Sequence, residues 1–286
     1  MKRAEASSTA KVIAAATILL ECETKNDSQV LSEAAAWCQV FLSGTRRDRW
    51  LAWSAKQPCV RKFWRWIEWA TLPGIIEHYA WRKRWIESLC RQAIADGCSQ
   101  VVVVGAGFDT LSLRLAHEFP AVSFIELDHP ATSSAKWQAF AGKNHVAPKN
   151  LSIIAVDLAA TSLPEIQNSA NFSFWIIEGV LMYLEESAVD KLFAQIAETT
   201  QKRQVLFSLM RRWSAGESGF RPQSRLIDAW LSWRGEPFRW SISPDAIEPF
   251  LQNRGYTFLQ LIDPAAEGRA LCGENLVLAE MSGGNK

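Results

Sequence analysis

Carboxylate side chains follow three successive apolar stretches of this 286-residue chain. They are Asp128 after residues 122–127, Asp157 after 151–156, and Glu178 after 172–177. If these stretches are neighbouring parallel strands, their carboxyl ends line one crevice at the edge of a sheet, where ligands bind. Carboxylates there would accept hydrogen bonds from ribose hydroxyls, an adenine amino group and an α-ammonium group, and would repel a polyphosphate. The pattern therefore favours S-adenosylmethionine (SAM) over NAD or ATP.

A glycine turn precedes these acids. Residues 101–110 read Val-Val-Val-Val-Gly-Ala-Gly-Phe-Asp-Thr, and an unbroken apolar run predicts a strand buried on both faces. Gly105, Ala106 and Gly107 would allow a tight turn and a close approach of backbone to ligand. The dinucleotide fingerprint needs a third small residue where Thr110 stands, so the turn fits NAD poorly. Asp109 and Thr110 are candidate caps for a helix over 111–118.

Strands and helices alternate after this turn. The pattern predicts strands at 101–104, 122–127, 151–156, 172–177 and 204–209, with helices at 111–118, 130–141 and 186–200. A helix at 243–253 and an antiparallel hairpin of strands 255–262 and 274–281 follow. We therefore expect a doubly wound, Rossmann-like α/β fold with a seven-stranded sheet. Residues 211–240, rich in Arg, Gly, Ser and Trp, interrupt the alternation and predict an inserted lid.

Residues 1–95 are predicted to form a helical N-terminal cap, with helices at 8–22, 29–43 and 75–95. Large aromatics recur at helical spacing, and we expect most of them in the core: Trp50, Trp53, Phe63, Trp64, Trp66 and Trp69. The interleaved cations are expected on a solvated face. The concentration of tryptophans here and around 213–240 is consistent with either an aromatic-walled cavity or ordinary core packing.

Composition narrows the class of protein. The chain has 31 Lys+Arg and 30 Asp+Glu, so its net charge of +1 gives no reason to expect nucleic acid or a membrane as the main partner. Six scattered cysteines without a C-x-x-C pair predict free thiols and no metal site. The apolar run 12–20 resembles the apolar region of a signal peptide. Glu5, Lys11 and the absence of a small-x-small cleavage site instead favour a helix in a cytoplasmic protein.

Four motifs in order resemble the leucine carboxyl methyltransferase family. They are residues 100–115, residues 124–130 with Lys136 downstream, Asp157-Leu158, and residues 178–184. The resemblance covers most of the chain from about 75 to 281 and is closer to the bacterial branch, whose members are described as O-methyltransferases of small molecules. It is weaker before residue 75. It implies a class I SAM-dependent methyltransferase fold, so we expect a SAM-binding methyltransferase domain at 96–286 after the helical cap at 1–95.

The resemblance also implies a set of cofactor contacts: Lys11, Arg82, Gly105, Ala106, Gly107, Asp128, Asp157, Leu158 and Glu178. Asp128 would bind the ribose, and Asp157 and Leu158 would lie beside the adenine. Arg82, with Arg84 as the neighbouring alternative, would bind the carboxylate of SAM, and Lys11 would cover the same site.

The expected reaction is methyl transfer to a carboxylate or hydroxyl oxygen of a small molecule or peptide. A carboxylate acceptor is ionised at neutral pH and needs no general base. A hydroxyl needs one, but no histidine has a convincing partner in sequence, so no catalytic residue is assigned. Tyr183 either orients an acceptor or packs in the core. A nicotinamide-dependent oxidoreductase and a non-catalytic SAM-binding protein remain as alternatives, and the oligomeric state stays open.

Overall fold

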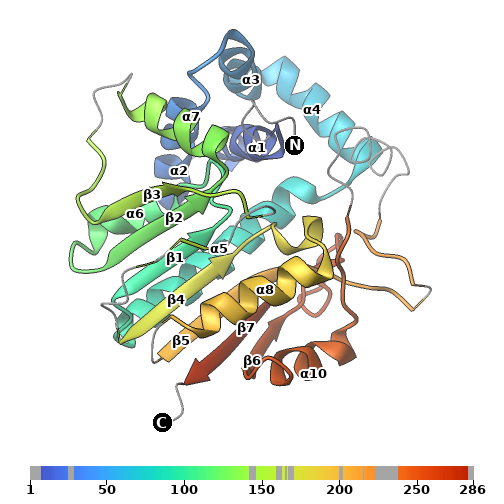
Figure 1. Cartoon of the computed structure of the whole chain (residues 1–286). Helices are drawn as coiled ribbons and strands as arrows, with labels where there is room; N and C mark the ends of the chain where they lie inside the picture. Colours follow the sequence, from blue (N-terminus) through green and yellow to red (C-terminus); the bar gives the residue numbers. More distant parts are fainter. Residues whose placement is uncertain are drawn as a thin grey trace.

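The computed structural model describes residues 8–24, 29–141, 146–158, 163–164, 166, 171–199, 202–214, 216–222 and 238–282. These residues form a seven-stranded sheet in the order β3-β2-β1-β4-β5-β7-β6 (Figure 1). The strands are β1 Gln100–Val104, β2 Ser123–Asp128, β3 Leu151–Ala155, β4 Phe172–Ile177, β5 Lys202–Met210, β6 Thr257–Ile262 and β7 Glu274–Ser282.

The first five strands are parallel, and β7 runs antiparallel to both β5 and β6. Because β1 pairs with β2 on one side and β4 on the other, the strand order reverses beside β1. This reversal is the switch point at which open α/β sheets bind ligands. The order and the antiparallel β7 are those of the class I methyltransferase fold, so the predicted fold class, including the final hairpin, is confirmed.

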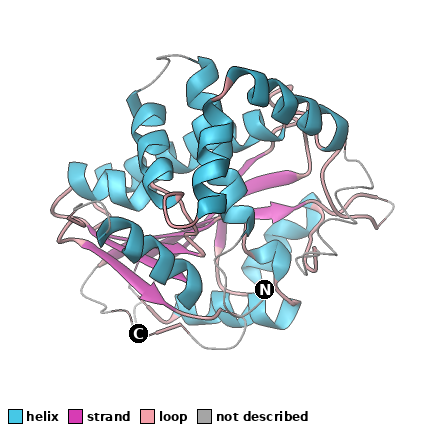
Figure 2. Ribbon diagram, turned by 90° about the horizontal axis from the view of Figure 1, so that it is seen from above, coloured by secondary structure: helices cyan, strands magenta, loops and turns pink. Residues whose placement is uncertain are grey.

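Helices cover both faces of the sheet (Figure 2). Val101 and Val103 of β1 pack into one hydrophobic cluster, and Val102 and Val104 pack into another. The first cluster joins α1 Ser8–Thr24, α2 Gln29–Phe41, α5 Ile75–Ala95, α6 Leu111–Glu118 and α7 Pro130–Ala141. The second joins α8 Glu186–Ala197 and α10 Ile247–Gln252. The four valines are therefore buried on both faces, as the apolar run predicts.

Local sequence signals set the starts of several helices. Gly74, at φ +87°, precedes α5, and Pro130 is the first residue of α7, where its missing N–H costs no hydrogen bond. Asp109 caps α6, because its Oδ1 accepts from the N–H groups of Thr110 (2.6 Å) and Leu111 (3.2 Å). Each signal is local, and each of these helices begins within a residue of its predicted position.

Two further helices, α3 Arg46–Lys56 and α4 Pro58–Thr71, form a hairpin joined through Gln57. Five of the six aromatics expected in the core are exposed: Trp50, Trp53, Phe63, Trp66 and Trp69. That expectation is wrong for a physical reason. The aromatic side chains of α4 extend around more of the helix than the neighbouring helices cover, so only some of them are buried. The partly buried Trp64 points inward and donates from Nε1 to Ser54 Oγ at 3.1 Å.

The apolar run 12–20 lies within α1, which is helical as predicted and contributes Ile18 and Leu19 to the core. Across the described ranges, no helix combines the length and apolarity needed to cross a bilayer. The division at 95/96 falls between α5 and β1, although buried residues of α1, α2 and α5 share one cluster with β1. The division into cap and methyltransferase domain stays a prediction.

The predicted lid is described only at its two ends, since residues 223–237, with Trp230 and Trp233, lie outside the described residues. The first end pairs with the chain before β7, where Arg221 and Cys272 exchange backbone hydrogen bonds of 2.8 and 3.0 Å. A Cβ on Gly273 would lie 2.4 Å from the Gly219 carbonyl oxygen, so the two segments touch backbone to backbone. The role of this insertion as a lid stays a prediction.

Candidate functional site

The glycine turn lies at the carboxyl end of β1. Gly105 donates its N–H to the Leu127 carbonyl at 2.7 Å, and Gly105 and Gly107 have φ of +69° and +54°. A Cβ on Gly105 would lie 2.3 Å from Val180 Cγ2, and one on Gly107 would lie 3.2 Å from Ala10 Cβ. The chain after β4 and helix α1 therefore both approach the turn so closely that side chains are excluded there.

Asp128, at the end of β2, is bonded to this turn. Its Oδ2 accepts from the Gly107 N–H and its Oδ1 accepts from the His129 N–H (2.6 Å). Burial raises the pKa of Asp128, and these two N–H groups oppose the rise. A carboxylate offers about four lone-pair directions, so two remain for a ligand.

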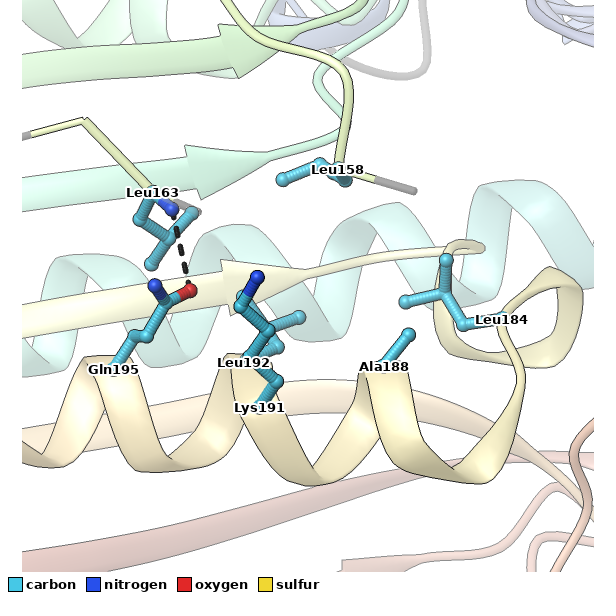
Figure 3. A pocket seen from close by; sticks show the side chains of 7 residues that line it. All are labelled: Leu158, Leu163, Leu184, Ala188, Lys191, Leu192 and Gln195. Carbon is cyan, nitrogen blue, oxygen red and sulfur yellow. Dashed lines mark hydrogen bonds between the residues drawn. The ribbon is translucent and has the colours of Figure 1, made fainter. Parts of the chain in front are cut away.

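Asp157 and Leu158 follow β3 at the same edge. Ala155 is in register with Asp128, and Val156 donates to the Asp128 carbonyl at 2.7 Å, so the half-buried Asp157 follows directly. Leu158 lines a pocket between the chain after β3 and helix α8 (Figure 3). Its other lining residues are Leu163, Leu184, Ala188, Lys191, Leu192 and Gln195. The wall is largely aliphatic, and the Leu163 N–H donates to Gln195 Oε1 at 3.2 Å.

Arg82 on α5 lies between two buried carboxylates. Its Nε donates to Glu178 Oε1 at 2.8 Å, and its Nη1 lies 2.6 and 2.5 Å from the two oxygens of Glu274. His78 Nε2 is 3.0 Å from Glu274 Oε2. Glu274 begins β7 and is in register with Met210 at the end of β5, so it belongs to the same edge of the sheet.

Charge pairing sets the protonation of this cluster. Burial alone would raise the pKa of Glu274, but the charge of Arg82 and the hydrogen bond from His78 outweigh it and lower that pKa to about 2. Burial alone would lower the pKa of Arg82, but Glu274 and Glu178 raise it. Arg82 and Glu274 are therefore both charged at neutral pH.

Lys83 connects the ends of β1 and β4. Its Nζ lies 2.9 Å from Asp109 Oδ2 and 2.7 Å from Glu178 Oε2. Burial alone would raise the pKa of Asp109, but Lys83 lowers it to about 2. The cluster of Arg82, Lys83, Asp109, Glu178 and Glu274 thus pairs two basic side chains with three acidic ones.

The remaining predicted positions lie around this centre. Lys11 on α1 pairs with Asp48 at 2.9 Å, while its neighbour Ala10 touches the glycine turn. Arg84 is exposed, so Arg82 is the arginine that reaches the sheet edge. The Tyr183 ring lies 6.0 Å from that of Phe238, in an apolar cluster formed by Leu72, Met182, Met210, Phe220 and Leu271.

Sequence reasoning missed Lys83, His78 and Glu274 as members of the cluster. The signal for Lys83 was its position directly after Arg82. The signal for Glu274 was a carboxylate at the start of the last strand, which an antiparallel β7 brings to the same edge as the carboxyl ends of the parallel strands. His78 lies one helical turn before Arg82, so the two share a face of α5.

The fold and this edge of the sheet define an α/β protein with class I methyltransferase topology and a glycine turn beside clustered acids. A family model described as leucine carboxyl methyltransferase matches residues 11–197. This match covers more than half of the chain, and the chain belongs to the leucine carboxyl methyltransferase family.

Curated proteins and solved structures are similar to parts of this chain. A Streptomyces coelicolor protein named "putative S-adenosyl-L-methionine-dependent methyltransferase" is 34% identical over 121 residues, which are 41% of this chain and 42% of that protein. A Mycolicibacterium gilvum protein with the same description is 28% identical over 164 residues, 55% of this chain and 52% of that protein. The chain thus spans about half the length or less of the curated relatives it matches. Magnesium protoporphyrin IX methyltransferase from Synechocystis PCC 6803, solved with bound SAH, gives a TM-score of 0.48 at 15% identity, covering 71% of this chain and 84% of that chain.

Proposed function

We propose that this chain is a SAM-dependent methyltransferase that transfers the methyl group to an oxygen atom, of a carboxylate or hydroxyl, on a small molecule or a protein C-terminus. The observation that carries the proposal is the bond between Asp128, at the end of β2, and the Gly107 N–H after β1, with Glu178 directly after β4 on the other side of β1. Family membership and the class I topology support it.

The residues at the sheet edge fit the chemistry of SAM. Asp128 keeps lone pairs for the two ribose hydroxyls, and Leu158 offers an aliphatic surface for the adenine. Gly105 and Gly107 keep the turn free of side chains, and their N–H groups hold it to Leu127 and Asp128. Asp157 would accept from the adenine amino group and Glu178 from the α-ammonium. The excess of acidic over basic side chains in the cluster suits a ligand that carries a sulfonium and an ammonium group.

Arg82 would bind the carboxylate of SAM, with Lys83 beside it. Arg82 is oriented by Glu178 and Glu274, and the one Nη2 hydrogen that these contacts leave over could be donated to that carboxylate. Ala106 completes the turn. Lys11 would close the site from α1, since α1 already touches Gly107 through Ala10.

Bound SAM supplies an electrophilic methyl group, and the chain must position an acceptor oxygen in line with it and exclude water. Positioning can supply roughly 7–11 kcal/mol of the barrier. A carboxylate acceptor fits best, because it needs no proton removed. Tyr183, which follows β4, and Phe238, which precedes η2 Pro244–Ala246, form an aromatic pair that would orient such an acceptor. Among the described histidines, His78 faces Glu274 in the interior, His117 is exposed, and His129 Nδ1 accepts from the Ala131 N–H.

A thermal-shift titration with SAM and S-adenosylhomocysteine tests the proposal. Ligand at a hundred times Kd stabilises by about 2.7 kcal/mol, which should raise the melting temperature by about 5 °C. Asp128→Asn should abolish most of the shift, and Asp245→Asn, an exposed aspartate on the surface, should leave it intact. No shift with either ligand would overturn the proposal, and a shift with NADH alone would favour the oxidoreductase.

Radiolabelled methyl transfer from SAM to fractionated lysate then tests catalysis. Label that base releases as methanol indicates a carboxyl methyl ester, whereas base-stable label indicates an ether. A chain that binds SAM but labels no fraction would be a non-catalytic SAM-binding protein.

A further inference from the structure

The α3–α4 hairpin carries an exposed surface that the proposed methyl transfer does not use. Five large aromatics are more than half exposed there: Trp50 55%, Trp53 52%, Phe63 54%, Trp66 59% and Trp69 71%. Isolated exposed hydrophobics are common, but a cluster this size on two adjacent helices marks an interaction surface. Figure 1 shows α3 and α4 together at one end of the molecule, away from β6 and α10.

The aromatics are arranged along helix faces. On α4, Cys59, Phe63, Trp66 and Ala70 recur at i, i+4, i+7 and i+11, which forms one straight stripe, and all four are exposed. The rings of Phe63 and Trp66 stack with centroids 6.1 Å apart. The opposite side of α4 is held to α3 by the hydrogen bond from Trp64 to Ser54, so the stripe faces outward.

The same two helices carry exposed cations. The exposed cations of the hairpin are Arg46, Arg47, Arg49, Lys56 and Lys62. In the described part of the chain none of these five pairs with a carboxylate. The two acids between residues 44 and 70, Asp48 and Glu68, are buried and paired. The hairpin surface is therefore cationic, although the whole chain has a net charge of only +1.

The combination of tryptophans with cations that pair with no described carboxylate indicates the kind of partner that this surface binds. Tryptophan prefers the boundary between headgroups and acyl chains, and helices that lie in this boundary carry Lys and Arg beside an aromatic stripe. A second copy of the chain fits poorly, because a twofold interface would place the five cations against themselves. Stacked bases need a platform or groove, whereas these rings project from convex helices.

We propose that the α3–α4 hairpin is a peripheral membrane-binding surface that lies on anionic phospholipid headgroups and inserts Phe63 and Trp66 at the interface. In this arrangement the hairpin lies on the bilayer and does not cross it. The hairpin contacts α1, which touches the glycine turn through Ala10, so the bound lipid surface lies one helix away from the candidate cofactor site. The sequence-based expectation of no membrane partner considered net charge, which hides this local asymmetry.

Cys59 gives a direct probe, since it is the only exposed cysteine of the six and belongs to the stripe. The full chain is labelled there with an environment-sensitive fluorophore and mixed with vesicles of equal parts phosphatidylcholine and phosphatidylglycerol. We expect a blue shift, co-sedimentation with the vesicles and weakening by salt, and little binding to pure phosphatidylcholine. Equal binding to both vesicles, or binding to neither, overturns the proposal.

Matched variants locate the surface. Arg46→Gln and Lys62→Gln should each lower the partition coefficient about fivefold, whereas Lys149→Gln, an exposed lysine elsewhere, should leave it unchanged. Trp66→Ser should lower it about tenfold or more, whereas Trp137→Ser, 42% exposed on α7, should not. If Arg46→Gln, Lys62→Gln and Trp66→Ser bind vesicles like the wild type, the proposal is overturned.

Two further measurements distinguish other occupants. A dimer in sedimentation equilibrium that dissociates in Trp66→Ser would make the face a subunit interface, and tighter binding to a single-stranded oligonucleotide than to vesicles would make it a nucleic-acid site. Either result overturns the proposal. The SAM-induced thermal shift of each variant, expected unchanged, reports separately on the proposed methyltransferase function.

Discussion

Glu274→Gln tests the charged cluster that holds Arg82. Glu274 is 1% exposed and its pKa falls from 4.5 to about 2 in the folded chain. A shift of this size corresponds to about 3 kcal/mol of stability at pH 7. Because the folded pKa is depressed, the contribution is complete well above pH 4.5 and is lost as pH falls toward 2, with about 2 kcal/mol gone by pH 3.

Removing the carboxylate charge should therefore destabilise the chain by about 3 kcal/mol at pH 7 and flatten its acid dependence. Urea unfolding at pH 7 and pH 3 measures both effects. Glu280→Gln is the control, because Glu280 lies on the same strand but is 24% exposed and pairs with Lys202 at 3.4 Å. Its cost should stay below about 1 kcal/mol.

A second variant, at Arg82, separates the loss of the Arg82–Glu274 ion pair from the loss of the Glu274 carboxylate. Arg82→Met alone leaves Glu274 buried without its guanidinium and should cost about 3–5 kcal/mol. The double variant Arg82→Met/Glu274→Gln should lose clearly less stability than the two single variants lose together, because it leaves no unpaired charge between these two positions. A Glu274→Gln chain within about 0.5 kcal/mol of wild type at pH 7, or with unchanged acid dependence, would refute this account.

Three further substitutions test the packing around the site. Gly105→Ala should cost about 1–2 kcal/mol for the left-handed backbone plus the clash with Val180, and Val180→Ala should recover only the clash; a cost below about 1 kcal/mol by urea unfolding contradicts this. Lys136→Met leaves the buried Glu126, 2.6 Å away, without its cation and should cost about 3–5 kcal/mol by the same assay, most of it recovered by Glu126→Gln. Tyr256→Phe removes a 3.0 Å hydrogen bond to a buried carbonyl and should lower stability by about 1 kcal/mol in thermal melts; no change would show that the bond is replaced by water.

Local patterns predict the sheet well. The valine run predicted β1, and the six further strands begin within two residues of their predicted starts, because β-branched and aromatic runs bounded by turns leave few alternatives. The shared edge of Asp128, Asp157 and Glu178 follows from parallel strands alone. These are the parts of the fold in which each element depends on its own sequence.

Long-range pairing was not predictable. His78 and Arg82 meet Glu274 across more than 190 positions, and no local period connects them. The sequence also did not predict which aromatic side chains of α4 are buried. Periodicity shows that one side of a helix is apolar, but not how much of that side a neighbouring helix covers. Trp64 is partly buried and Trp66 exposed on the same helix, and only the position of α3 decides between them.

The antiparallel last strand has a consequence during synthesis. Arg82 is translated early, yet its carboxylate partner Glu274 leaves the ribosome almost two hundred residues later. Until then the guanidinium has Glu178 at most, and the nascent polypeptide cannot complete the salt-bridge cluster. The growing chain can therefore complete this salt-bridge cluster, which belongs to the proposed cofactor site, only once the β6–β7 hairpin has joined the sheet.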